Sequence, residues 1–323
     1  MSVSAIRGIS ILNIADESSP HMETKFAIRP ANPSDREDVL KLCEHSFDWG
    51  DYVPDVWDEW IRDRQSRIFA ATLDNRPVAI MRVSLPKPSE AWLQAARTHP
   101  AHRRMGIATA LALACLEWAR SNGARVARLS TDSDNYIAQK ALEKMNFVRV
   151  SDFLTMKCGK LQAEDSIECR WGAISDANRI WKFLKESDVF KASGGLYTVL
   201  FVWKTLEKKD LKRFVTSGKA IVHTSEKDVD GLILIDDGVR TRWEEDPVQT
   251  CYIDGDRRAI SKMLRFLKSQ SHVEGFRRIY AFACNLPLVS EALTAAGFAS
   301  DDQNTEFIYE KPLIPSRNER RVI

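Results

Sequence analysis

Three features that would assign this chain of 323 residues to a special class are missing. No apolar run is long enough to span a bilayer, and residues 1–25 hold one basic residue, Arg7, before a short apolar patch, which makes a poor secretory signal. There is also no excess of charge, since 47 basic residues face 45 acidic ones. We therefore expect neither a membrane nor nucleic acid as an obligatory partner.

The cysteines do not follow the spacing of a metal site or of a disulfide framework. The six cysteines are scattered, with no Cys-x-x-Cys pair and no histidine at ligand spacing. A chain of this size without such spacing is typical of a protein with reduced, buried thiols rather than a disulfide framework or a zinc site. The sequence thus predicts no metal centre and a cytoplasmic location.

What the sequence does contain is a repeated order of elements. Short apolar or alternating runs follow amphipathic runs from Lys25 onward, which indicates a mixed α/β (α+β) fold. The order begins again after a polar linker, and the interval from Gly106 to Phe147 nearly equals that from Gly255 to Phe298. We interpret this as an internal duplication. The expected segments are a disordered leader 1–24, a first domain 25–158, a linker 159–165, a second domain 166–315 and a basic tail 316–323.

Within the second domain, most of the expected helices and strands follow clear apolar periodicity. Residues 196–215 are expected to be rich in helix.

The stretch 96–109 carries the strongest functional signal. An apolar run passes through Pro100 into Arg103-Arg104-Met105-Gly106, and an amphipathic run follows as far as Gly123. This order predicts a strand, a tight loop and the start of a helix. Backbone N–H groups are unpaired at such a junction, and the helix dipole is positive there, so an anion such as a pyrophosphate is the expected ligand.

These residues resemble a known signature. Arg103, Gly106 and Ala108 fit the motif Gln/Arg-x-x-Gly-x-Gly/Ala of the GCN5-related N-acetyltransferase (GNAT) superfamily. A second cofactor motif of that superfamily is matched downstream by Asn135, Ala138, Glu143, Lys144 and Phe147. The resemblance covers about residues 26–158, with a weaker echo over 165–313. It implies two tandem GNAT-like domains, each a twisted mixed sheet flanked by helices.

The resemblance implies acetyl-CoA as the acyl donor. The amides of Arg104 through Thr109 would hold its pyrophosphate, and main-chain groups of Ala96 and Thr98 would pair with the pantetheine arm as an added strand does. Asn135 would bond the pantetheine or steady the strands, although it could be only a helix cap. The expected cofactor contacts are Ala96, Arg97, Thr98, Arg103, Arg104, Met105, Gly106, Ile107, Ala108, Thr109 and Asn135.

Acetyl transfer needs a base for the amine and a proton for the leaving thiolate. Glu90 and Asp51 are the candidate bases, with His99, Asp48 or relayed water as alternatives. The tyrosine that often protonates the thiolate in this superfamily is replaced here by Leu142. The glycine usual before the next aromatic residue is Asn146, which tolerates a left-handed backbone.

The acceptor site is expected near one aromatic and acidic segment. The expected contacts are Phe47, Asp48, Trp49, Asp51 and Tyr52. Residues 51–67 and the additional C-terminal domain also resemble histidine N-acetyltransferases, which favours a free amino acid or a related small amine.

The second domain is expected to be degenerate. Its counterpart of the anion loop holds Asp254 and Asp256, whose charges would repel pyrophosphate. Arg240 or Arg242 could meet an acceptor carboxylate.

The sequence thus predicts an acetyl-CoA-dependent N-acetyltransferase acting on a small-molecule amine. A non-catalytic acetyl-CoA-binding regulator and a protein N-acetyltransferase remain the alternatives. The oligomeric state is open, and a monomer is compatible with a second domain that covers the first.

Overall fold

The computed structural model of the chain describes residues 26–44, 50–163, 168–226, 228–236, 247–300 and 305–313. The chain forms two compact units. Unit 1 comprises Met1–Ala127 and Pro312–Ile323, and unit 2 comprises Arg128–Lys311. The leader 1–24 and the tail 316–323 lie outside the described residues.

Unit 1 is built on four antiparallel strands in the order β1-β2-β3-β4. The two-residue turn Asp74-Asn75 joins β2 to β3, and both of its residues have the positive φ that such hairpin turns require. The elements are β1 (Ala27–Pro30), α1 (Arg36–Cys43), α2 (Val53–Trp60), β2 (Ser66–Leu73), β3 (Arg76–Lys87), β4 (Glu90–Thr98) and α3 (Ile107–Ser121).

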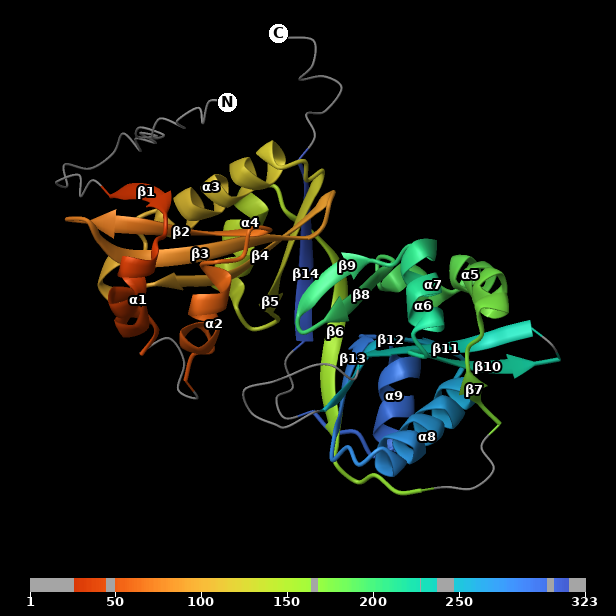
Figure 1. Ribbon diagram of the computed structural model, residues 1–323. Coiled ribbons are helices and arrows are strands. Elements are labelled where there is room, and N and C mark those ends of the chain that lie inside the picture. The colour runs from red at the N-terminus through yellow and green to blue at the C-terminus, as the bar shows by residue number, and fades with distance from the viewer. Residues whose placement is uncertain are drawn as a thin grey trace, which may run out of the picture. The chain divides into compact units, whose positions relative to one another are not determined.

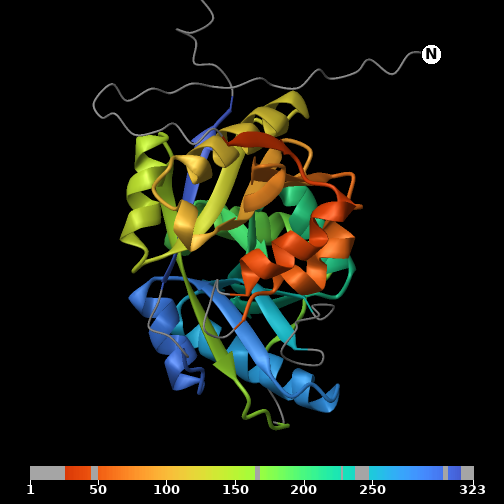
Figure 2. The same ribbon diagram turned by 90° about the vertical axis from the view of Figure 1, so that its left-hand side faces the viewer.

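Helices cover both faces of these strands. Figures 1 and 2 show α3 on one face and the pair α1 and α2 on the other. The α1/α2 face is a closed apolar layer in which Val39 and Trp57 are fully buried against Ile68 and Ile80 of the sheet. This packing fixes the positions of the polar side chains of β3 and β4 that share the face.

Unit 2 contains most of the chain. Strand β5 (Val126–Asp132) spans the unit boundary in the sequence, and the strand order of unit 2 is β5-β14-β6-β13-β12-β11-β10-β7. The first elements are α4 (Tyr136–Lys144), β6 (Val148–Cys158), β7 (Arg170–Trp171), α5 (Ala177–Glu186), α6 (Asp188–Ala192), β8 (Leu196–Val199), β9 (Val202–Thr205) and α7 (Lys208–Thr216). The others are β10 (Ala220–Ser225), β11 (Asp228–Asp236), β12 (Val248–Gly255), α8 (Arg257–Val273), β13 (Ile279–Cys284), α9 (Pro287–Ala295) and β14 (Thr305–Pro312).

Unit 2 also buries an apolar layer on each face of its sheet. Ile260, Leu264 and Leu267 of α8 pack with α9 on one face, and α5 and α7 pack on the other (Figure 1). A mixed sheet between two helical layers is the architecture that the sequence predicted.

The two units share a detail that supports the predicted duplication. In unit 1, both guanidinium nitrogens Nη1 and Nη2 of Arg29 donate to Asp35, at 2.7 Å each. In unit 2, Arg170 binds Asp176 in the same way, at 2.6 and 2.9 Å. Each aspartate also accepts a hydrogen bond at 2.8 Å from the backbone N–H three residues before it. The same bidentate pair thus anchors the first helix of each repeat.

The strands that end the two repeats lie side by side. Strand β14 lies between β5 and β6, and the other edge of β6 pairs with β13. In the sequence, β6 follows α4 and β14 follows α9, so each of them sits beside a strand of the other repeat. For this reason the compact units differ from the segments 25–158 and 166–315, which remain a proposal about the repeats.

One sequence expectation is corrected. Residues 196–205 form the hairpin β8–β9 rather than helix, and α7 begins only at Lys208. The turn residues Leu200 and Phe201 have φ of 49° and 58°, so the turn is made by residue types that give no turn signal. Within the described residues, no helix is long and apolar enough to cross a membrane.

Candidate active site

The predicted anion loop of unit 1 has the expected form. Strand β4 ends at Thr98, a short 3-10 turn covers Pro100–His102, and α3 begins at Ile107. Arg104 and Gly106 both have left-handed backbone conformations, with φ of 64° and 72°. A Cβ atom added to Gly106 would meet no atom within 4 Å, so the glycine is required by the backbone and not by crowding.

The backbone amides of this loop are available for a ligand. Ala110 is the first residue after Arg103 whose N–H donates within the chain, to the carbonyl of Gly106 at 3.0 Å. Among the described residues, the N–H groups from Arg104 through Thr109 have no protein acceptor, and no side chain caps the helix. Arg103, Arg104 and Gly106 are exposed beside them. Unpaired amides at a helix N-terminus next to two cations are the features that anion binding requires.

Strand β4 carries a β-bulge that no pattern in the sequence predicts. Ile80 pairs with Arg97 while Arg82 pairs with Gln94, so β4 holds one more residue than β3 between these pairs. The additional residue lies at Ala95 and Ala96, and Ala95 has a φ of 56°. A bulge disrupts the ladder and turns backbone groups to a new direction. Alanine has no preference for this conformation, so only the three-dimensional structure reveals the bulge.

Asp51 and Arg97 form a buried ion pair on the α1/α2 face. Arg97 Nε and Nη2 donate to the two carboxylate oxygens of Asp51 at 2.6 and 3.1 Å, and the two side chains are 10% and 1% exposed. Asp51 also accepts from the N–H of Val53 at 3.0 Å, at the start of α2. The structure thus joins an expected acceptor residue to an expected cofactor residue.

The remaining expected acceptor residues divide between described and undescribed parts of the chain. Tyr52 lies under the guanidinium of Arg97, 5.4 Å from the ring centroid, and meets the Trp60 ring edge to face at 5.9 Å. Phe47, Asp48 and Trp49 lie outside the described residues, as do Arg240 and Arg242.

Glu90 is buried at the first position of β4 and aligns with Lys87 of β3. Alternation along a strand places Glu90, Trp92 and Gln94 on one face of β4. Because Gln94 pairs with Arg82, Glu90 shares that face with Arg82. Glu90 makes polar interactions of its own, so its carboxylate is not free.

Arg82 is a buried cation on this face that the sequence analysis did not single out. It is 8% exposed, donates from Nη2 to Asp63 at 2.9 Å, and places its guanidinium 4.4 Å from the centroid of the Trp60 ring. The available signal was a charge inside the apolar run Val78–Val83 of an alternating strand.

Asn135 and Leu142 belong to unit 2. The side-chain oxygen of Asn135 accepts from the N–H of Ala138 at 3.2 Å and caps α4, and the residue is exposed. Leu142 is 7% exposed and buried on the inner side of this helix. Asn146 has a φ of 58°, the left-handed conformation expected of it.

The start of α8, the second-repeat counterpart of the anion loop, is chemically different. Asp256 caps α8 by accepting from the N–H of Ala259 at 2.7 Å. Asp254 is buried and accepts from the hydroxyls of Tyr252 and Ser187 at 2.5 and 2.7 Å. Burial raises the pKa of Asp254 to about 6. An aspartate side chain already occupies the first turn of this helix, which supports the expectation that the second repeat binds no pyrophosphate.

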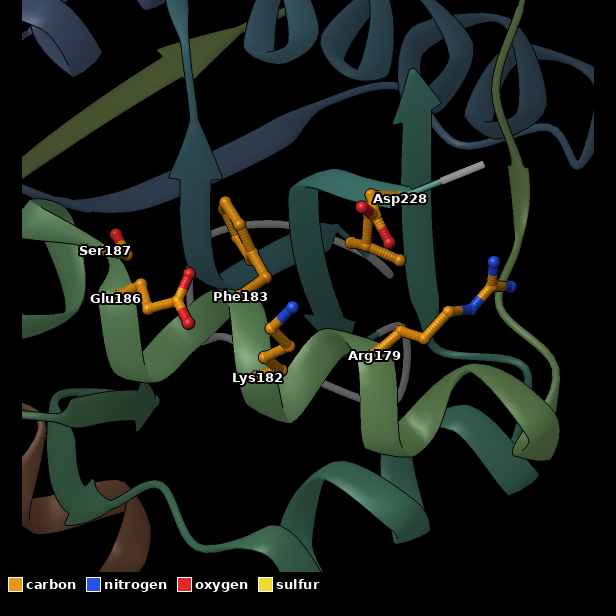
Figure 3. A pocket seen from close by; sticks show the side chains of 7 residues that line it. Arg179, Lys182, Phe183, Glu186, Ser187 and Asp228 are labelled. Carbon is orange, nitrogen blue, oxygen red and sulfur yellow. The ribbon is translucent and has the colours of Figure 1, made fainter. Parts of the chain in front are cut away.

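A separate cavity of about 260 Å³ lies in unit 2, between α5 and the beginning of β11 (Figure 3). Lys182 and Glu186 of α5 and Asp228 of β11 border it, and Arg179 at its edge is paired with Asp176. No residue predicted from the sequence lines this cavity.

Comparison with known proteins agrees with this geometry. Residues 37–147 match the model of the acetyltransferase (GNAT) family. A search of curated protein sequences gave no match.

Solved structures of low sequence identity share the fold of the chain. A GCN5-related N-acetyltransferase from Sphaerobacter thermophilus is 15% identical, with a TM-score of 0.58 over 90% of this chain and 96% of that one. A tandem GNAT protein from the clavulanic acid biosynthesis pathway is 13% identical, with a TM-score of 0.53 over 90% of this chain and 100% of that one. A fungal multi-domain β-N-acetylglucosaminidase contains a glucosamine N-acetyltransferase region that is 14% identical, with a TM-score of 0.57 over 94% of this chain and 40% of that one.

The open amides at the start of α3 thus lie in a segment that matches the acetyltransferase (GNAT) family. The chain as a whole shares its fold with solved GNAT structures, a tandem GNAT protein among them.

Proposed function

We propose that the protein transfers the acetyl group of acetyl-CoA to the amine of a small molecule, a free amino acid or a related amine. The observation that carries this proposal is the set of unpaired amides from Arg104 through Thr109. Their number and direction suit the pyrophosphate of acetyl-CoA, and Arg103 and Arg104 add positive charge. Gly106 gives the backbone the shape that the loop needs.

The pantetheine arm and the thioester are assigned to strand β4. Main-chain groups of Ala96 and Thr98, with Arg97 between them, would pair with the pantetheine as an added strand does. The bulge at Ala95 and Ala96 supplies backbone N–H groups outside the regular ladder, which can polarise the thioester carbonyl. Asn135 stays in this proposal on its sequence pattern alone.

The reaction is written as a direct transfer. The neutral amine attacks the thioester carbon, the carbon–sulfur bond breaks, and the amine gives up one proton while the thiolate gains one. Glu90 is retained as the proposed base from the sequence, and Asp51 is less suited to that role because both of its oxygens accept from Arg97. Asp51 is then a positioning residue that holds the start of α2. Water protonates the thiolate, since Leu142 has no hydroxyl.

Three observations support a small acceptor. The described acceptor residues Asp51 and Tyr52 are buried or half-buried against a closed apolar layer. The fungal glucosamine N-acetyltransferase region, which shares the fold, is named for a small amine. The six cysteines are free thiols, which supports a cytoplasmic location, where such amines are abundant.

The proposal is tested by binding and turnover together. Calorimetry should show acetyl-CoA binding, and release of coenzyme A thiol should be detected with at least one member of a panel of free amino acids, polyamines and peptides. Failure of acetyl-CoA to bind would refute the proposal. Thiol release with peptides alone would identify a protein N-acetyltransferase, and tight binding with no turnover would identify a regulatory protein.

A further inference from the structure

Arg82 lies beside the bulge of β4, on the face of unit 1 that α1 and α2 cover. It pairs with Ile68 of β2 on one side and with Gln94 of β4 on the other. Ile68 belongs to the apolar layer beneath α1 and α2, so Arg82 faces the same layer. Gln94 directly precedes Ala95, where the bulge begins. A guanidinium is therefore placed next to the backbone that we assign to the thioester.

The two buried arginines of this face differ in how completely they are neutralised. Arg97 has both carboxylate oxygens of Asp51 as partners. In the part of the chain that the structure describes, Arg82 makes one hydrogen bond, from Nη2 to Asp63, whose side chain is 33% exposed. A guanidinium has five N–H donors, so Asp63 leaves most of them available.

One of the available donors is buried. Among the described residues, the Nε of Arg82 is shielded from solvent and has no hydrogen-bond acceptor. A buried donor without a partner is costly, and a charged one more so. Trp57 Nε1, in the same layer, is also buried without an acceptor in the part of the chain that the structure describes.

The electrostatic environments of the two arginines also differ. Burial lowers the pKa of Arg82, and the nearby Asp63 does not offset this effect. Burial also lowers the pKa of Arg97, but the hydrogen bonds that Arg97 donates to Asp51 and the charge of that carboxylate outweigh burial, so the pKa is raised. Asp63 and Glu59 near Arg82 thus compensate the charge of its guanidinium less completely than Asp51 compensates that of Arg97.

The neighbouring rings complete a recognition surface. The guanidinium of Arg82 stacks on Trp60, whose ring in turn meets Tyr52. Stacking holds the guanidinium plane in one orientation and leaves its edge for planar, bidentate partners, and carboxylates are the groups that match this geometry.

We propose that the acceptor carries a carboxylate as well as its amine, and that the guanidinium of Arg82 binds this carboxylate beside the Trp60 ring. The proposal rests on the acetyl-transfer function above and names the substrate class of that site. It assigns to Arg82 the task that sequence reasoning had offered to Arg240 or Arg242.

The test begins with the unmodified protein and pairs of acceptors that differ in one group. Each L-amino acid is compared with the amine left by its decarboxylation and with its carboxamide, with thiol release as the readout. Wild type is expected to prefer the carboxylate in the best pair by at least about 10-fold in kcat/KM. Equal or better turnover of the decarboxylated amines would overturn the proposal and leave the acetyl-transfer function intact.

Variants then assign the preference to Arg82. Arg82→Gln is expected to lower kcat/KM for the carboxylate substrate by about 100-fold, because a charge-assisted hydrogen bond is lost, and to change that for the decarboxylated amine by less than about 3-fold. Acetyl-CoA affinity should stay as in wild type. Arg76→Gln is the matched control, since Arg76 lies on the same strand in an exposed pair with Asp38, and it should behave as wild type.

Three outcomes separate the possibilities. If Arg82→Gln does not fold, Arg82→Lys serves instead. It keeps the positive charge but lacks the planar, bidentate guanidinium, and it should still lose most of the preference for the carboxylate substrate. A uniform loss for both acceptors would show a structural role and overturn the proposal. If wild type binds acetyl-CoA but acetylates neither acceptor of any pair, both this inference and the proposed function fail.

Discussion

Replacing Gly106 by asparagine, with Gly123→Asn as its control, tests the assignment of the anion loop most directly. Both glycines have left-handed backbones, with φ of 72° and 91°, and they stand at the two ends of α3. An added Cβ meets no atom within 4 Å at Gly106, and its nearest contact at Gly123 is at 3.8 Å. The two substitutions are therefore matched in backbone and in space, and only one lies at the proposed ligand.

The expected effect on stability is small and similar for both variants. A residue other than glycine costs roughly 1–2 kcal/mol in this conformation, and asparagine costs less because it is enriched there. Each variant should lose at most about 1 kcal/mol of unfolding free energy in urea. Gly106→Ala should lose more than Gly106→Asn, because alanine lacks that preference.

The effect on ligand binding should separate the two variants. At position 106 the new side chain occupies the open space in front of the amides, where it competes with a bound pyrophosphate. Hydrogen bonds to a charged group contribute about 1.5–3 kcal/mol each, so loss of one predicts a Kd for acetyl-CoA at least about 10-fold weaker by calorimetry. Gly123→Asn should bind as wild type does. Equal affinity of Gly106→Asn and wild type would show that this loop does not hold the cofactor.

Three further predictions concern buried charges. Asp51→Ala should lower the free energy of unfolding by about 3–5 kcal/mol, because it leaves Arg97 buried without its partner, and Arg97→Leu in the same chain should restore part of it, as urea titrations would show. Burial raises the pKa of Asp254 from 3.8 to about 6, so the folded protein binds this proton more tightly than the unfolded chain does. The resulting contribution to the free energy of unfolding is complete below pH 3.8 and is lost as the pH rises to about 6. This pH dependence should be absent from Asp254→Asn. Burial, aided by the charge of Asp132, raises the pKa of Glu306 from 4.5 to about 7, so stability should fall between these pH values in wild type and not in Glu306→Gln, measured by thermal unfolding.

The predictable part of the fold is the part encoded by local pattern. The strand, loop and helix around Gly106 follow from short-range rules, since Pro100 ends the strand and a glycine supplies the left-handed backbone. The hairpin β8–β9 was missed because Leu200 and Phe201 hold a turn conformation that usually requires asparagine or glycine. Tertiary contacts stabilise that turn: the N–H of Leu200 donates to buried Gln249.

The candidate site shows the same division. The amides of the anion loop were predictable because a helix start always leaves them unpaired. The bond between Asp51 and Arg97 joins residues far apart in the sequence, and the open donors of Arg82 depend on how α2 packs on β3. No periodicity encodes such pairings, so the residues that would recognise the acceptor emerge only from the folded structure.

Comparison of the two repeats distinguishes residues that maintain the fold from residues that are expected to bind the cofactor. Both units keep the bidentate pair of the first helix, Arg29 with Asp35 and Arg170 with Asp176. Both also join a residue that accepts from a backbone N–H at the start of their second helix to a strand side chain, Asp51 to Arg97 and Ser187 to Asp254.

The shared features therefore belong to folding, since they persist in both repeats. The start of the long helix differs, because unit 1 leaves its amides open at Gly106 while Asp256 fills the first turn in unit 2. A fold does not by itself confer an activity, which depends on the groups placed at a site. The difference at this one helix start is accordingly the physical reason to expect a single acetyl-CoA site in a chain that contains the fold twice.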